Sequence, residues 1–118
     1  MFLIYVMNKL VYVPQYALIG THPPNVCPMT SKAAREAAIK AYAEVEKSAK
    51  KKGARLITDI HLDPDHKTFQ LWEAPSAEAV RDIIVQAGFF YFLNIEFHLV
   101  TPIPDLLKEA DKFTTIYP

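Results

Sequence analysis

Two amphipathic segments with helical periodicity, each bounded by a capping residue and a glycine, set the layout of this chain. Residues 30–52 place small and apolar side chains three and four positions apart, and Gly53 then supplies the left-handed conformation that ends a helix. Residues 76–87 repeat this pattern, with Ser76 as the predicted cap and Gly88 as the stop. Strand-like runs lie before, between and after the two segments, at 15–21, 54–62, 68–74 and 94–101.

The order strand, helix, strand, strand, helix, strand predicts an α+β domain of the ferredoxin-like type, βαββαβ, with a four-stranded antiparallel sheet. Right-handed crossovers would place both helices on one face of the sheet and leave the other face bare. The first strand of the motif then lies between the third and the fourth. We assign residues 15–112 to this single domain, with a short helix at 105–112, and residues 113–118 to a tail.

Residues 1–14 lie outside the motif. Their apolar run predicts an extra strand or hairpin across an Asn8-Lys9 turn, and the alternative is an extension that precedes a start at Met7. The run lacks the basic stretch and cleavage site of a signal peptide. No window reaches the about 20 apolar residues of a membrane span. We therefore expect a soluble, cytoplasmic protein with no membrane partner.

Composition narrows the classes of function. Thirteen basic and thirteen acidic residues give a formal net charge of zero, which argues against a nucleic-acid binder and permits self-association. The single cysteine, Cys27, excludes an intrachain disulfide framework and a multi-cysteine zinc cage. The three glycines are not clustered, so the chain lacks a phosphate-binding loop and we expect no nucleotide cofactor.

Strand alternation assigns each side chain of the sheet to one of two faces. The predicted bare face mixes polar and apolar side chains: Ile57, Asp59 and His61, then Thr68, Gln70 and Trp72, then Asn94, Glu96, His98 and Val100. A solvated sheet face rarely carries a tryptophan, whereas a dimer interface around a polar-lined cavity would use this mixture. We therefore expect a homodimer through this face, with Gln70, Trp72 and Asn94 lining a ligand cavity.

Three segments resemble those of a small uncharacterised family: 20–28 (GTHPPNVCP), 72–79 (WEAPSAEA) and 94–100 (NIEFHLV). That family is similar to the dimeric α/β-barrel superfamily, in which two ferredoxin-like sheets face each other. The resemblance covers residues 16–107 and implies a homodimer. The superfamily includes cofactor-free monooxygenases, haem-dependent enzymes, stress-induced proteins and nickel-binding proteins, so the resemblance implies no single function.

The most distinctive motif is the proline-rich loop with His22 and Cys27, at the carboxyl end of the first strand. We expect that end to meet Trp72 and Glu73 at the exit of the third strand, and Glu96 at the start of the fourth. Cys27 also precedes a helix amino terminus, which favours a thiolate. His22, Cys27 and Glu96 then suit a base, a nucleophile and an orienting acid, or three ligands of a divalent metal. The alternative is a buried thiol and a histidine bonded to its own backbone.

Other histidines offer weaker signals. His98 shares a strand and a face with Glu96, which suits a proton shuttle or a polar residue that lines a dimer cavity. His61 and His66 flank an Asp-Pro-Asp turn, which we place at the far end of the molecule from His22, and we interpret both as surface histidines.

Three functions stay open at this point. The first is a homodimeric protein that binds a small ligand or a metal ion in a cavity beside His22 and Cys27. The second is a cofactor-free enzyme of the monooxygenase or isomerase kind, with Glu96 or His98 in acid–base roles. The third is a structural or stress-related dimer.

Overall fold

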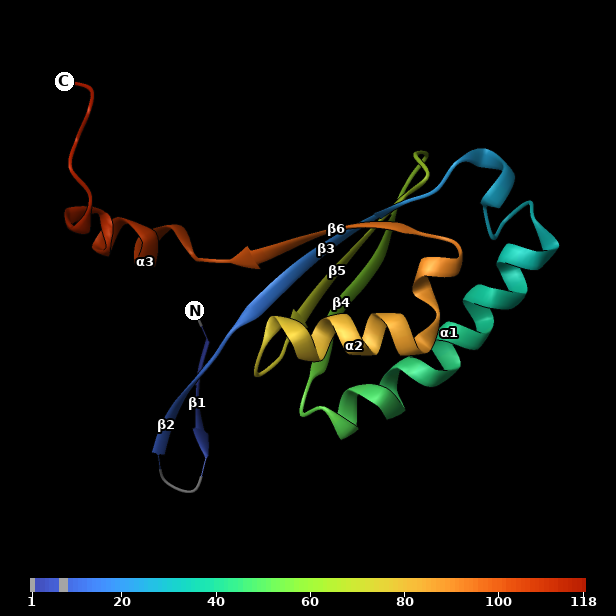
Figure 1. Ribbon diagram of the computed structural model, residues 1–118, viewed down its shortest axis with the longest axis horizontal. Coiled ribbons are helices and arrows are strands. Elements are labelled where there is room, and N and C mark those ends of the chain that lie inside the picture. The colour runs from blue at the N-terminus through green and yellow to red at the C-terminus, as the bar shows by residue number, and fades with distance from the viewer. Residues whose placement is uncertain (1, 7–8) are drawn as a thin grey trace.

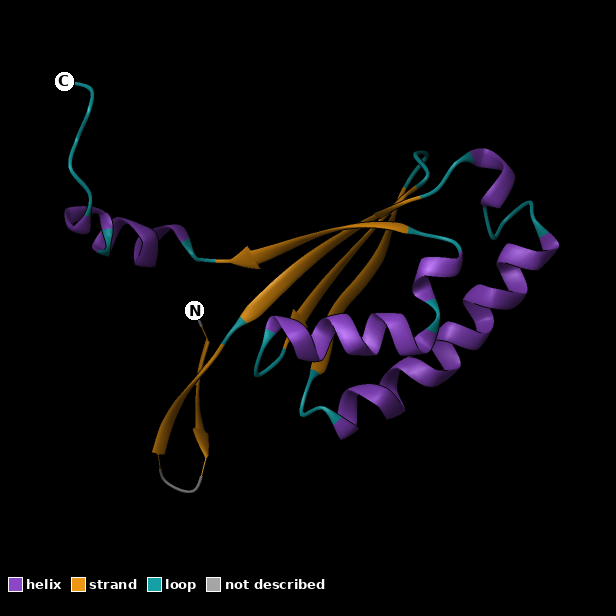
Figure 2. Cartoon of the chain, viewed as in Figure 1, coloured by secondary structure: helices purple, strands orange, loops and turns teal. Residues whose placement is uncertain are grey.

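The computed structural model describes residues 2–6 and 9–118, and their side chains from residue 13 onward. It has an α+β fold in which one face of a four-stranded antiparallel sheet carries two helices (Figures 1 and 2). The strands are β3 (Gln15–Thr21), β4 (Arg55–Leu62), β5 (Lys67–Glu73) and β6 (Asn94–Val100), and the helices are α1 (Lys32–Lys51) and α2 (Ala77–Ala87). The strand order is β4-β5-β3-β6, which confirms the predicted ferredoxin-like topology.

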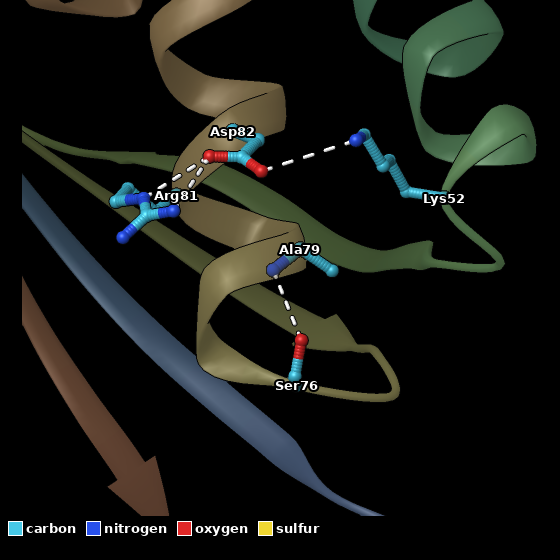
Figure 3. A network of polar contacts seen from close by, with 5 residues as sticks. All are labelled: Lys52, Ser76, Ala79, Arg81 and Asp82. Carbon is cyan, nitrogen blue, oxygen red and sulfur yellow. Dashed lines mark hydrogen bonds and ion pairs between the residues drawn. The ribbon is translucent and has the colours of Figure 1, made fainter.

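Both helices begin and end where the sequence predicts. Ser31 caps α1 and Ser76 caps α2, each side chain accepting a hydrogen bond from the backbone N–H three residues on, at 3.2 and 3.1 Å. Figure 3 shows the second of these caps, from the Ala79 N–H to the Ser76 hydroxyl. Gly88 ends α2 with a φ of 91°, a conformation that favours glycine. Asp82 of α2 lies 3.9 Å from the Lys52 amino group at the end of α1, also seen in Figure 3. This exposed pair adds little stability beside the apolar contacts of the two helices.

The hydrophobic core lies between the helices and one sheet face, which we call the covered face. Its members include Tyr16, Leu18 and Trp72 from the sheet, Ala34, Ala41, Val45 and Ala49 from α1, and Val80, Ile83, Ile84 and Ala87 from α2. The helical positions match the stripes predicted from the sequence. Phe89 and Phe92 join the core from the connector after α2, which contains a 3₁₀ turn, η2 (Phe89–Tyr91).

The prediction that Thr68, Gln70 and Trp72 lie on the bare face is wrong, and Thr68 pairs with Gly20 on the covered face. Trp72 pairs with Tyr16 and Gln70 pairs with Leu18, so both belong to the covered face, and Trp72 is 0% exposed. The segment Phe-Gln-Leu-Trp has apolar side chains of both parities, and its alternation therefore does not select a face. Phe69 instead lies on the opposite face, which we call the bare face.

A bulge reverses the predicted faces of β4 as well. The register shifts between Leu56 and Thr58, so the parity of every later residue changes. Leu56 faces the helices as predicted, but Asp59 and His61 join it on the covered face and Ile60 moves to the bare face. In β6 the prediction is confirmed: Ile95 packs on the core, and the side chains of alternate parity lie on the bare face, namely Asn94, Glu96, His98 and Val100.

Both ends of the described chain extend from this body (Figure 1). The predicted amino-terminal hairpin is present as β1 (Phe2–Val6) paired with β2 (Lys9–Val13), and the proposed turn residue Asn8 and the alternative start Met7 lie outside the described residues. At the other end, α3 (Ile103–Lys108) and the 3₁₀ turn η3 (Ala110–Lys112) replace the predicted helix at 105–112. Pro104 sits in the first turn of α3, where its missing N–H costs nothing.

These extensions account for a radius of gyration of 17.1 Å, above the roughly 13.5 Å of a compact domain of this length. Within the described residues, none of the helices is both long and apolar enough to cross a bilayer.

Candidate metal centre and its pocket

The candidate site forms where β3 ends beside the hairpin turn that joins β4 to β5. Because β3 and β5 are antiparallel, Thr21 lies opposite Lys67 at the start of β5. The His22 N–H donates a hydrogen bond to the His66 carbonyl oxygen at 3.2 Å. The predictions that this turn lies far from His22, and that the loop meets the exit of β5, are therefore wrong. His66 is half-buried against His22 and is not a surface histidine.

The two imidazoles of this cluster face each other closely. Nε2 of His22 lies 3.2 Å from Nδ1 of His66, with the rings inclined at 68°. His22 is 7% exposed, and its Nδ1 has no hydrogen-bond partner among the described residues. Burial, followed by repulsion from His66 and His61, lowers the pKa of His22 below the usual 6.5. Neutral imidazole is the form that binds a metal ion.

Cys27 completes the cluster from the other side of the loop. It is buried and follows a 3₁₀ turn, η1 (Pro24–Val26), within the proline-rich loop. The Cys27 carbonyl oxygen accepts hydrogen bonds from the N–H groups of Thr30 and Ser31, at 3.0 and 2.7 Å. These bonds tie the loop to the start of α1 and fix the position of the cysteine.

Ligand atoms of His22, Cys27 and His66 all lie within 4.8 Å of one another. Two nitrogens bound to one tetrahedral zinc ion are about 3.3–3.4 Å apart, which matches the His22–His66 separation. A thiolate on the same ion would lie about 3.5 Å from each nitrogen, so binding requires a contraction of at most about 1.3 Å at the sulfur. This donor set suits a borderline transition-metal ion.

Glu96, which we predicted to join His22 and Cys27, points elsewhere. It pairs with Ile19 on the bare face, and its Oε2 lies 3.3 Å from Nε2 of His98, also on that face. Both side chains are exposed. The structure therefore brings His66 rather than Glu96 to the His22 and Cys27 pair. The missed signal was the antiparallel pairing of the first and third strands of the motif, which places the end of one beside the start of the other.

A pocket of about 280 Å³ adjoins the cluster. It lies among the loop after β3, the α1 helix, the covered face and the segment after η2, and its lining residues are His22, Cys27, Pro28, Met29, Ala38, Tyr42, His61, Thr68, Phe92 and Leu93. In the described part of the chain, the predicted cavity residues Gln70, Trp72 and Asn94 do not belong to this lining. Gln70 and Trp72 bond to each other in the core, from Nε1 of the indole to the amide oxygen at 3.0 Å.

Two polar side chains of the pocket wall have defined partners. The Tyr42 hydroxyl donates to Oδ1 of Asp59 at 3.3 Å, and burial together with this carboxyl raises the pKa of the Tyr42 phenol, which therefore stays protonated. Nδ1 of His61 lies 2.6 Å from Oδ1 of Asp63. No sequence signal pointed to Tyr42, because it lies outside the predicted apolar stripe of its helix.

The fold and the cluster define the class: an α+β protein of ferredoxin-like strand order with two histidines and a cysteine gathered beside a pocket. No family model matches the sequence, and the search of curated proteins finds no match.

Two solved structures show some likeness to the fold. The first is a "putative amidohydrolase/peptidase" from Burkholderia cenocepacia, 11% identical with a TM-score of 0.46. That alignment covers 75% of this chain, which spans only 27% of the length of the Burkholderia protein. The second is At3g17210 from Arabidopsis thaliana, 20% identical with a TM-score of 0.41, over 75% of this chain and 94% of that one.

Proposed function

We propose that this protein binds a divalent transition-metal ion through His22, Cys27 and His66, and that a small molecule in the adjoining pocket completes the coordination. The observation that carries the proposal is the approach of two imidazoles and one thiol within 4.8 Å, with His22 and Cys27 buried. Three protein ligands leave one position of a tetrahedral ion open, as in catalytic zinc sites. Structural zinc sites usually fill all four positions with protein ligands.

The buried ring of His22 supports the same proposal. An unpartnered buried polar atom costs about 1–3 kcal/mol, and Nδ1 of His22 has no partner among the described residues. A metal ion on Nδ1 would give that atom a partner. A metal ion on Nε2 would instead replace the close contact between the nitrogens of His22 and His66. The first arrangement would give a buried unpartnered atom a ligand, and the second would replace the hydrogen bond between the two rings with bonds to the ion.

Metal analysis tests this proposal directly. Protein purified without a metal-affinity tag is loaded with zinc or cobalt, and its affinity is measured by competition with a chelator. We expect Cys27→Ser and His66→Ala to lower the affinity by about 100-fold or more, because each removes one of three ligands. His98→Ala is the matched control, since it removes an exposed imidazole on the bare face. Equal affinity in Cys27→Ser and wild type would exclude the thiol as a ligand.

We also propose that two copies associate through the bare face. Ile60, Phe69 and Ile19 form an apolar row across it, and Ile60 is 49% exposed. Neither α1 nor α2 covers this side of the sheet (Figure 2), and zero net charge leaves little repulsion between copies. Light scattering should give the mass of two chains for wild type and for the α1 control Ile39→Lys, and of one chain for Ile60→Lys. A monomeric wild type would contradict this proposal.

The Glu96–His98 pair supports a second candidate function, cofactor-free acid–base catalysis of the monooxygenase or isomerase kind between the facing sheets. Their side chains lie 3.3 Å apart on the bare face, where a dimer would enclose them. The test is turnover of a panel of quinols and small enolisable compounds. Activity that survives Glu96→Gln would exclude Glu96, and a dimer with neither metal nor turnover would point to the structural role.

A further inference from the structure

We infer that the pocket takes a small, largely apolar molecule that presents one oxygen-donor group to the metal position and to His61. This inference rests on the proposed metal centre and names the class of ligand for its open coordination position.

The size and lining of the pocket define the body of this ligand. A volume of about 280 Å³ falls just below the range typical of pockets for drug-sized molecules. Met29, Ala38, Phe92 and Leu93 supply an apolar wall from the loop, from α1 and from the segment after η2. Among the described residues, no Lys, Arg, Asp or Glu lines the pocket. A charged group on the body of the ligand would therefore lack a partner of opposite charge.

Two polar lining residues from neighbouring strands define the position of the donor group. His61 and Thr68 are cross-strand neighbours on the covered face, close to where β3 leads into His22. Because Nδ1 of His61 donates to Oδ1 of Asp63 at 2.6 Å, Nε2 of the neutral ring holds a lone pair and can accept a hydrogen bond from an O–H or N–H of a ligand. The Tyr42 hydroxyl already donates to Asp59, so it offers a ligand only its lone pairs. A metal-binding oxygen that carries a proton, or that has an N–H beside it as in a hydroxamate, therefore fits between the metal position and His61.

Gly20 shapes the polar side of the pocket. A Cβ at this position would lie 2.5 Å from the Thr68 hydroxyl oxygen and 3.1 Å from a Leu93 methyl group, and both of those residues line the pocket. Any larger residue would push these side chains toward the space that we assign to the ligand.

Two hydroxamates on the cobalt-loaded full chain test the inference. Benzohydroxamate and acetohydroxamate share the same metal-binding group, but the first carries a phenyl ring where the second carries a methyl group. Binding is followed through the visible absorption of cobalt, which changes when a ligand enters its coordination sphere. We expect both to change the spectrum, and benzohydroxamate to bind about tenfold tighter or more, because its ring is buried against the apolar wall.

Variants locate the binding in this pocket. Ala38→Leu should remove the preference for the ring and leave cobalt and acetohydroxamate binding intact. Met29→Asp is the second test should that variant fail to fold, since Met29 is 75% exposed. An aspartate at this position should lower the affinity for benzohydroxamate about tenfold. His61→Gln should weaken both hydroxamates severalfold, and His98→Gln is the control that should change neither.

Each result either supports or overturns the inference. Cobalt that binds but responds to neither hydroxamate, or equal affinity for the two, overturns the ligand class and leaves the metal centre standing. If Ala38→Leu and Met29→Asp both keep the preference for benzohydroxamate, the ligand binds elsewhere and the inference is overturned as well. Cobalt that does not bind to the wild type overturns the metal centre and this inference together.

Discussion

The two faces of the sheet carry similar residue types but differ in how far their side chains are exposed to solvent. On the covered face, the helices and the loop bury Trp72, Gln70 and His22, and the pocket lies at one end of that layer. On the bare face, Glu96 and His98 are exposed and bond to each other. Burial changes the properties of a histidine: it lowers the pKa of His22 and leaves one ring nitrogen without a partner in the part of the chain that the structure describes. Position relative to the helices, more than residue type, separates the candidate metal site from a solvated polar pair.

The largest expected effect tests which face holds the fold together. Trp72→Ala should lower the free energy of unfolding by about 3–5 kcal/mol, because it empties the largest fully buried side chain of the core. Ile60→Ala, on the bare face, should cost less than about 1 kcal/mol in the monomer, since half of that side chain is already exposed. Urea denaturation at low protein concentration measures both. Equal losses would remove the distinction between the two faces.

A smaller effect is expected at Gly20, on the covered face. Gly20→Ala should destabilise the protein by about 1–3 kcal/mol, because the added methyl group overlaps the Thr68 hydroxyl. Thr68→Ala removes that oxygen, so the double variant should recover part of the loss in urea denaturation. A double variant whose two losses simply add would show that the contact does not exist in solution.

Local signals explain what the sequence predicted correctly. Caps at Ser31 and Ser76 and the apolar stripes of both helices depend on neighbouring residues, and together with the strand order they define the topology. The face of β5 was not predictable, because Phe69 and Trp72 give both of its faces apolar side chains. The bulge beside Ile57, which reverses the second half of β4, has no signature in the sequence.

The candidate site was predicted in part for a related reason. The loop motif identified His22 and Cys27 from their types and spacing alone. The third candidate ligand, His66, comes from a turn 44 residues further on, and only the antiparallel register places it beside His22. Glu96 lies near the same end of the sheet, but its parity directs it to the bare face.

The pH dependence of the metal-free protein should report the burial of His22. A folded-state pKa below 6.5 means that the unfolded chain binds more protons as the pH falls below that value. Stability should therefore decrease from pH 6.5 downward until the folded His22 also becomes protonated. Chemical denaturation over this range should show a weaker dependence in His22→Gln than in wild type, with His98→Ala as the control. An unchanged dependence in His22→Gln would contradict the assignment.

The smallest expected effect is on the bare face, where the comparison predicts no change in metal binding. Glu96→Gln and His98→Ala should keep the zinc or cobalt affinity of the wild type, because their side chains do not belong to the cluster of His22, Cys27 and His66. Stability should change by no more than about 0.5 kcal/mol, since exposed ion pairs contribute little. The measurements are chelator competition and urea denaturation on the same samples. A loss of metal in Glu96→Gln would place this carboxylate at the ion. That result would contradict the assignment of Glu96 to the bare face, because a side chain on that face cannot reach a metal ion on the other side of the sheet.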